Sequence, residues 1–229
     1  MNSILKANQL TKTFDATTIP VHAVKEVNID IHEGEITVLT GRSGSGKSTL
    51  LHLLAGLEQK TSGTIFYKDK RYDDLTFNEL PTLRRSDMGF VYQFHYLLNE
   101  LTAIENVSLP LLMNNLEKKE VLEKSKEILN ILGLSHRFTH KPSEMSGGEK
   151  QRVAIARSMV HSPSLVILDE PTGDLDSQTA LEVIESLKNY VSDVKSSLII
   201  ATHDMNFKEI SDQTLIMDLS LIHLSEPTR

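Results

Sequence analysis

The sequence predicts an α/β fold: a phosphate-loop core on a mostly parallel sheet, with an N-terminal antiparallel β part and an inserted helical subdomain. Short apolar strand patterns alternate with helical patterns, and this alternation is typical of parallel sheets. A glycine-rich loop separates one buried strand from the helix that follows it. A largely helical stretch at about residues 97–160 then interrupts the strands. Together these observations define the fold class.

The first elements are strands followed by one helix. Apolar residues in 27–31 alternate with Asn28 and Asp30, which predicts a strand with one buried face. Residues 36–39 form a short apolar run before Gly41, as a fully buried strand does. From Lys47 the pattern becomes helical until Gly56 closes it. The apolar face of this helix consists of Leu50, Leu51, Leu53 and Leu54.

The middle of the chain predicts the inserted subdomain. Residues 64–67 and 88–93 have strand patterns. The stretch 97–145 that follows is largely helical and includes the charged segment 117–132. We therefore expect a helical subdomain between two strands of the core.

The last third returns to alternating strand and helix. Residues 165–168 and 197–201 are short apolar strands. A helix lies between them, and its apolar face consists of Ala180, Val183, Ile184, Leu187 and Val191. No internal repeat interrupts this order, so we expect residues 1–218 to form a single domain.

Composition excludes several classes of protein. The 229 residues include no cysteine, which excludes disulfides, thiolate metal sites and a cysteine nucleophile. The formal charge of −7 argues against nucleic acid as a partner. No apolar run approaches the roughly 18 to 20 residues of a membrane span, and the first ten residues lack the layout of a secretory signal. We expect the chain to stay in the cytosol.

The glycine-rich loop fits the pattern G-x-x-x-x-G-K-[ST] and lies between a strand and a helix, where that pattern binds phosphate. Backbone N–H groups and the helix N-terminus would surround the phosphates. Lys47 should reach the β- and γ-phosphates, and the Ser48 hydroxyl should bind Mg²⁺. The predicted nucleotide-binding residues of this loop are Gly41, Arg42, Ser43, Gly44, Ser45, Gly46, Lys47, Ser48 and Thr49. A chance glycine-rich turn is the alternative.

Two carboxylates, Asp169 and Glu170, follow the buried strand 165–168. Ligands of open α/β sheets collect at the carboxyl ends of the strands. Asp169 can hold the Mg²⁺ hydration shell, and Glu170 can polarise the attacking water. Ordinary loop solvation or a helix cap is the alternative, but the phosphate loop upstream favours the catalytic interpretation.

The segment 145–152, Met-Ser-Gly-Gly-Glu-Lys-Gln-Arg, resembles the signature sequence of ABC ATPases. Ser146 with Glu149 also forms a capping box, which opens a helix that carries Val153, Ile155, Ala156 and Met159. The resemblance covers nearly the whole chain and implies ATP hydrolysis by a head-to-tail dimer. In such a dimer, the signature residues of one copy close on the ATP held by the other; they are Ser146, Gly147 and Gly148.

The same resemblance implies roles for further residues. Gln93 resembles the glutamine that senses Mg²⁺ and the γ-phosphate, Asp176 the family's D-loop, and His203 the switch histidine. Phe14 lies where the family places an aromatic ring against adenine, and ordinary core packing is the alternative for it. The predicted catalytic residues are Lys47, Glu170 and His203, and the predicted metal-binding residues are Ser48, Gln93 and Asp169.

Segments 92–98, 101–112 and 140–149 resemble the ATPase of the lipoprotein-releasing (Lol) system. This implies a peripheral protein on the cytoplasmic face of the inner membrane, with integral permease subunits as partners and lipoprotein as their cargo. Phe94, His95 and Tyr96 would line the groove for the permease; partly buried packing is the alternative. Macrolide or peptide exporters and a cell-division ATPase remain open, whereas DNA- or ribosome-acting relatives are least favoured.

Residues 219–229 depart from the family's usual ending. They resemble the translation of a transposase-type sequencing adapter, so we expect a non-native tail. A divergent natural terminus is the alternative.

Overall fold

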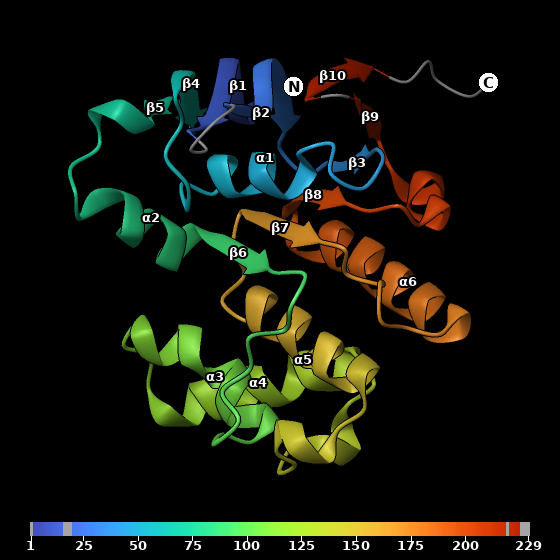
Figure 1. The fold of residues 1–229 in the computed structure, drawn as a ribbon. Helices are drawn as coiled ribbons and strands as arrows, with labels where there is room; N and C mark the ends of the chain where they lie inside the picture. The colour runs from blue at the N-terminus through green and yellow to red at the C-terminus, as the bar shows by residue number, and fades with distance from the viewer. Residues whose placement is uncertain (1, 16–19, 219, 225–229) are drawn as a thin grey trace.

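The computed structural model describes residues 2–15, 20–218 and 220–224. In this part of the chain the strands form two sheets, of four and six strands. Figure 1 shows both sheets in the upper half of the molecule, with helices α3, α4 and α5 gathered below them. The α/β fold class is confirmed.

The four-stranded sheet is antiparallel and has the order β2-β1-β4-β5. Its strands are β1 (Ser3–Phe14), β2 (Val21–His32), β4 (Ser62–Tyr67) and β5 (Lys70–Arg71). This confirms the predicted N-terminal antiparallel β part. The sequence pattern did not single out β1, because register shifts along its pairing with β2 break the alternation of buried and exposed positions.

The six-stranded sheet has the order β10-β9-β3-β8-β7-β6, and all its pairings are parallel except that of β10 with β9. Its strands are β3 (Ile36–Thr40), β6 (Met88–Val91), β7 (Leu165–Asp169), β8 (Ser197–Ala201), β9 (Gln213–Asp218) and β10 (Leu221–Leu224). Every residue of β7 and β8 is buried, as expected for central parallel strands. The predicted strand at 88–93 ends two residues early, at Val91.

The helices divide into two groups. Helix α1 (Lys47–Leu54) packs its buried leucines between the two sheets, and α6 (Ser177–Val194) buries its predicted face on the other side of the large sheet. Helices α3 (Ala103–Met113), α4 (Lys118–Ile131) and α5 (Gly147–Met159) share one core below the sheet. The remaining helical elements are α2 (Glu79–Asp87), η1 (Tyr72–Asp74), η2 (Ser135–Arg137), η3 (Pro142–Glu144) and η4 (Met205–Ile210).

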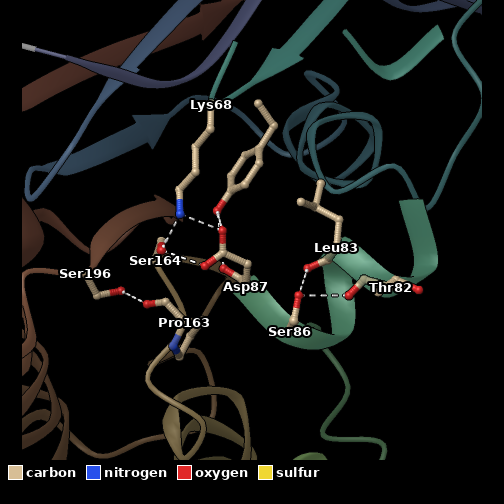
Figure 2. A network of polar contacts seen from close by, with 9 residues as sticks. Lys68, Thr82, Leu83, Ser86, Asp87, Pro163, Ser164 and Ser196 are labelled. Carbon is tan, nitrogen blue, oxygen red and sulfur yellow. Dashed lines mark hydrogen bonds and ion pairs between the residues drawn. The ribbon is translucent and has the colours of Figure 1, made fainter. Parts of the chain in front are cut away.

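Asp87 ties the two sheets together at the junction of α2 and β6 (Figure 2). Its Oδ2 accepts hydrogen bonds from the Tyr67 hydroxyl and the Lys68 ammonium, both at 2.7 Å, and its Oδ1 accepts one from Ser164 at 2.6 Å. Burial opposes ionisation of this carboxyl, but the three donors hold its pKa below the ordinary value. The antiparallel sheet is thereby fixed to the edge of the parallel one.

The predicted non-native tail is only partly described. Leu221–Leu224 pair with β9, and the Ser220 carbonyl accepts a hydrogen bond from the backbone N–H of Lys25 at 3.0 Å. Residue 219 and residues 225–229 lie outside the described part. Strand pairing uses backbone hydrogen bonds that almost any sequence can form, so it does not test the origin of the tail. The non-native origin of residues 219–229 stays a prediction, and so do the domain limits. None of the helices in the described residues is long and apolar enough to cross a membrane.

Candidate active site

The phosphate loop lies between β3 and α1, as the sequence predicts. Gly46 precedes the first turn of α1 with φ of 99°, and a Cβ atom there would overlap the Ala23 carbonyl oxygen. Gly41 has φ of 154°, and its Cβ would overlap the Met217 carbonyl oxygen. Only glycine fits both the left-handed backbone and the close approach of a neighbouring strand. The glycines of the motif are therefore required by this fold.

Lys47 folds back over the loop. Its side chain is buried, and its ammonium donates hydrogen bonds to the carbonyls of Gly41 at 2.8 Å and Arg42 at 3.1 Å. These contacts hold the charge inside the curve of the loop, where phosphate oxygens would lie.

A cavity of about 690 Å³ opens over the loop. It collects most of the predicted site residues at the carboxyl ends of the parallel strands, as open α/β sheets do. The predicted residues that line it are Gly41, Arg42, Ser43, Gly44, Gly46, Lys47, Ser48, Thr49, Gln93, Asp169, Glu170 and His203. Ser45 is buried beneath the loop, and its hydroxyl has no hydrogen-bond partner among the described residues.

Asp169 ends β7 and is buried at 3% exposure. Burial raises the pKa of its carboxyl, although a hydrogen bond with the Ser48 hydroxyl works in the opposite direction. Among the described residues its Oδ1 has no hydrogen-bond partner. A buried carboxylate oxygen without a partner beside a hydroxyl is a site that a hard cation would satisfy.

Glu170 has a backbone φ of 49°, which is rare for a residue with a side chain. Its N–H donates to the Ala201 carbonyl at 2.8 Å, which holds this conformation at the end of β8. Its Oε2 lies 2.9 Å from Nδ1 of His203, whose side chain is 76% exposed. The structure therefore pairs two of the three predicted catalytic side chains directly, one from the end of each central strand.

The signature residues lie at the N-terminus of α5, outside this cavity. Ser146 and Glu149 form the predicted capping box, with Ser146 Oγ accepting from Glu149 N at 3.2 Å and Glu149 Oε2 accepting from Ser146 N at 2.8 Å. Arg137 donates to the other carboxylate oxygen of Glu149 at 2.7 Å. Burial opposes ionisation, but these donors lower the pKa of Glu149.

Phe14 and Asp176 do not line the cavity, although each adjoins a residue that does: Phe14 pairs with Val21, and Asp176 follows Asp174 by two residues. Phe14 is 41% exposed at the end of β1, beneath the Lys12 ammonium at 4.6 Å from the ring centroid, so it is not a core residue. Asp176 caps α6 by accepting from the backbone N–H groups of Gln178 and Thr179. In a single chain Asp176 thus acts as a helix cap.

Sequence reasoning missed several residues of the cavity. Asp174 lines it beside Glu170, and residues 21–23 of β2 close its far side. Asp174 belongs to the same Gly-Asp-Leu-Asp segment as Asp176, which was the available signal. Nothing in the local pattern of residues 21–23 indicates a site, because they reach the loop only through the packing of one sheet on the other.

The aromatic segment after β6 has two sides. The Tyr92 ring contacts the rings of Phe90 and Tyr96, with centroids 4.4 and 5.2 Å away, and the Tyr96 ring also contacts that of Phe94 at 6.3 Å. Phe90 and Tyr92 line a second cavity of about 400 Å³ between α2 and α3. Phe94 and Tyr96 do not line it; their side chains are 69% and 62% exposed. The residues expected to line a groove, Phe94, His95 and Tyr96, therefore do not line this cavity.

Known proteins with similar sequences are nucleotide-binding subunits of transporters, which agrees with a phosphate-binding cavity. The ABC transporter family matches residues 24–173. The lipoprotein-releasing system ATP-binding protein LolD of Psychrobacter arcticus is 42% identical over 218 residues, which cover 95% of this chain and 96% of that protein. LolD of Acinetobacter baylyi is 43% identical over 215 residues, covering 93% and 94%.

Solved structures agree with the fold. The dimeric post-hydrolysis state of the ATP-binding cassette MJ0796, bound to ADP and Pi, superposes with a TM-score of 0.93 at 34% identity, covering 98% of this chain and 99% of that one. A second dimeric MJ0796 structure, described as a bacterial ABC transporter cassette, has the same TM-score at 35% identity. With its phosphate loop, strand-end carboxylates and capped signature helix in this arrangement, the chain belongs to the ABC transporter family, as the ATP-hydrolysing cassette.

Proposed function

We propose that this chain hydrolyses MgATP in a head-to-tail dimer and thereby powers a membrane permease that releases lipoproteins from the inner membrane. The observation that carries the ATPase half is the cavity at the carboxyl ends of β3, β6, β7 and β8. The lipoprotein half is supported by the two LolD relatives, which align with almost the entire chain.

The phosphate loop would bind the nucleotide. Its backbone N–H groups and the N-terminus of α1 face the cavity, so they can stabilise the negative charge of the phosphates. Lys47 would exchange its two carbonyl contacts for the β- and γ-phosphates. Phe14 is 41% exposed and would stack on adenine through the ring face that the Lys12 ammonium does not cover.

The donor set fits magnesium. Ser48 offers a hydroxyl, Gln93 an amide oxygen and Asp169 a buried carboxylate oxygen without a partner among the described residues. Mg²⁺ is commonly held by one or two carboxylates together with substrate phosphates and water. When bound, the ion would neutralise charge on the transferred phosphoryl group.

Glu170 would orient the attacking water. Its position at the strand end, fixed by the Ala201 carbonyl, directs its carboxylate into the cavity. His203 contacts Oε2 and leaves Oε1 available to a water molecule. Phosphoryl transfer depends mainly on positioning and charge stabilisation, and these residues supply both.

A second copy of the chain would complete the site. Ser146, Gly147 and Gly148 lie at a helix N-terminus outside their own cavity, although such a terminus is suited to bind an anion. A head-to-tail dimer would place them against the γ-phosphate held by the other copy. The dimeric MJ0796 structures support this arrangement for a cassette of the same fold.

The 400 Å³ cavity beside Tyr92 is the proposed contact for the permease. Apolar side chains of α2 and α3, including Pro81, Pro110 and Met113, line it together with Phe90. Aromatic and methionine side chains are typical of protein interfaces. Contact there would place the chain on the cytoplasmic face of the inner membrane as a peripheral protein.

The experiment is a pull-down with the Glu170→Gln chain. This variant should bind ATP and dimerise while its turnover falls by at least about 100-fold, because the water is no longer polarised. The ATP-bound variant is incubated with detergent-solubilised inner membranes, and the captured proteins are identified by mass spectrometry; the same variant with ADP is the control. An ATP-dependent permease that carries lipoprotein supports the proposal.

Two outcomes contradict it. Parental turnover in Glu170→Gln would reject this residue as the key carboxylate. Capture of a small-molecule exporter or a division protein instead would leave the ATPase chemistry intact and reject lipoprotein release.

A further inference from the structure

His95 carries a buried nitrogen that has no hydrogen-bond partner among the described residues. The atom is Nε2, and the side chain as a whole is 20% exposed. The closest acidic group is the Asp174 carboxylate, whose Oδ2 lies 3.6 Å from Nε2. This separation is beyond hydrogen-bond range by a few tenths of an ångström. A buried polar atom without a partner is costly, so a state in which this contact closes would be favoured.

The backbone that carries His95 is anchored. The guanidinium of Arg157, in α5, donates to the carbonyl of His95 at 2.9 Å and to the carbonyl of Tyr96 at 2.8 Å. Gln93, two residues earlier, lines the nucleotide cavity, and the rings of Tyr92 and Tyr96 contact each other on either side of it in the chain. The backbone at His95 is therefore held by Arg157 within two residues of the nucleotide cavity.

Asp174 is the freer partner. Its side chain is 64% exposed, and it lies in the short turn between Glu170 and the cap of α6. It lines the same cavity as Glu170. The turn also packs against the signature: a Cβ on Gly147 would lie 3.9 Å from the Asp174 Cβ, and a Cβ on Gly148 would lie 2.9 Å from Leu175 Cδ2. A shift of Asp174 toward His95 would thus move the turn relative to both the catalytic carboxylate and the signature glycines.

We propose that His95 is a positioning residue for ATP hydrolysis: in the ATP-bound dimer its Nε2–H donates a hydrogen bond to Asp174 and fixes the turn beside Glu170. The inference rests on the proposed dimeric function and adds to it a contact within each chain. This hydrogen bond would connect the segment that bears Gln93, Tyr92 and Tyr96 to the turn that contacts the signature helix. His95 does not touch substrate, so its effect is exerted through Asp174.

The test is a double-mutant cycle in the full-length chain, with kcat, KM for MgATP and Tm measured for each variant. His95→Ala and Asp174→Ala should each lower kcat about fivefold to tenfold, the loss expected for one hydrogen bond, with KM unchanged. The double variant should be no slower than either single one. His95→Gln, whose amide can still donate, should recover most of the rate. His140→Ala is the matched control, because His140 also has a buried nitrogen without a partner among the described residues but lies against the start of α3, where its carbonyl accepts from Ala103 N at 2.8 Å.

A merely structural role predicts a different pattern. The inference would be overturned if the decreases in kcat of the two single variants multiply in the double variant. It would also be overturned if His95→Ala and His140→Ala have the same kcat. ATP-dependent dimerisation of Glu170→Gln is measured in parallel. If that dimer fails to form, the proposed function fails; if it forms while the cycle is additive, only the role of His95 is rejected.

Discussion

Glu149 offers the sharpest test of how the signature helix is held. Its carboxylate accepts from Ser146 N at 2.8 Å and from Arg137 Nε at 2.7 Å, and its side chain is only 11% exposed. In Glu149→Gln the amide oxygen can still cap the helix, but the amide N–H₂ then faces the N–H of Arg137. The charged hydrogen bond from Arg137 to residue 149 is therefore lost, and two N–H donors face each other there.

The expected cost follows from that one contact. Hydrogen bonds to charged groups contribute about 1.5 to 3 kcal/mol, so we expect Glu149→Gln to lower the free energy of unfolding by about 2 kcal/mol. For a chain of this size that corresponds to a fall in Tm of about 4 to 8 °C. Differential scanning calorimetry at pH 7 measures it.

The pH dependence has a defined sign. Glu149 has a folded-state pKa below its ordinary value of 4.5, so its stabilising contribution is present above that value and is lost as the pH falls through the folded-state pKa. The Tm difference between wild type and Glu149→Gln should therefore stay constant from pH 7 down to the ordinary value of 4.5 and narrow as the pH is lowered further through the folded-state pKa.

Glu105→Gln is the matched control. Glu105 caps α3 with the same geometry, accepting from Thr102 N at 2.8 Å, but it is exposed and no ion pair to it is present among the described residues. We expect its replacement to cost about 0.5 kcal/mol or less. Equal Tm shifts in the two variants, or a Glu149→Gln shift that is constant with pH, would refute the role given to Arg137.

Two further predictions concern the phosphate loop and the metal site. Gly46→Ala should abolish binding of a fluorescent ATP analogue and lower Tm, because its Cβ would overlap the Ala23 carbonyl. Gly34→Ala is the control, because its φ is +73° but no atom lies within 4 Å of the added Cβ. It should lower the free energy of unfolding by only about 1 kcal/mol and leave binding intact. Asp169→Asn should lower turnover at least about 100-fold, since it removes the proposed Mg²⁺ contact, yet raise Tm without nucleotide, because it removes a buried charge; a lower Tm would contradict that account.

Much of the fold could be predicted because its signals are local. The leucines of α1 and the apolar face of α6 repeat at helical spacing, and both faces are buried as predicted. β7 and β8 could be predicted from short apolar runs, because central parallel strands are buried on both sides. β1 could not be predicted from the sequence pattern, because register shifts in its pairing with β2 interrupt the alternation of buried and exposed residues.

The sequence by itself determined which chemistry this chain carries. The phosphate loop, Asp169 with Glu170, and the signature capping box are short motifs, and each depends on a strand end or helix start within a few residues of it. Such features are specified by near neighbours along the chain, where spacing alone fixes geometry.

Only the tertiary structure decided which of these residues meet. The strand order β3-β8-β7-β6 brings the ends of strands more than 100 residues apart in sequence to one cavity, and it pairs Glu170 with His203. It also leaves Ser146 outside that cavity and sets His95 within reach of Asp174, 79 residues later. Contacts of this kind depend on strand order and on the packing of helices against sheets, and no local spacing in the sequence encodes them.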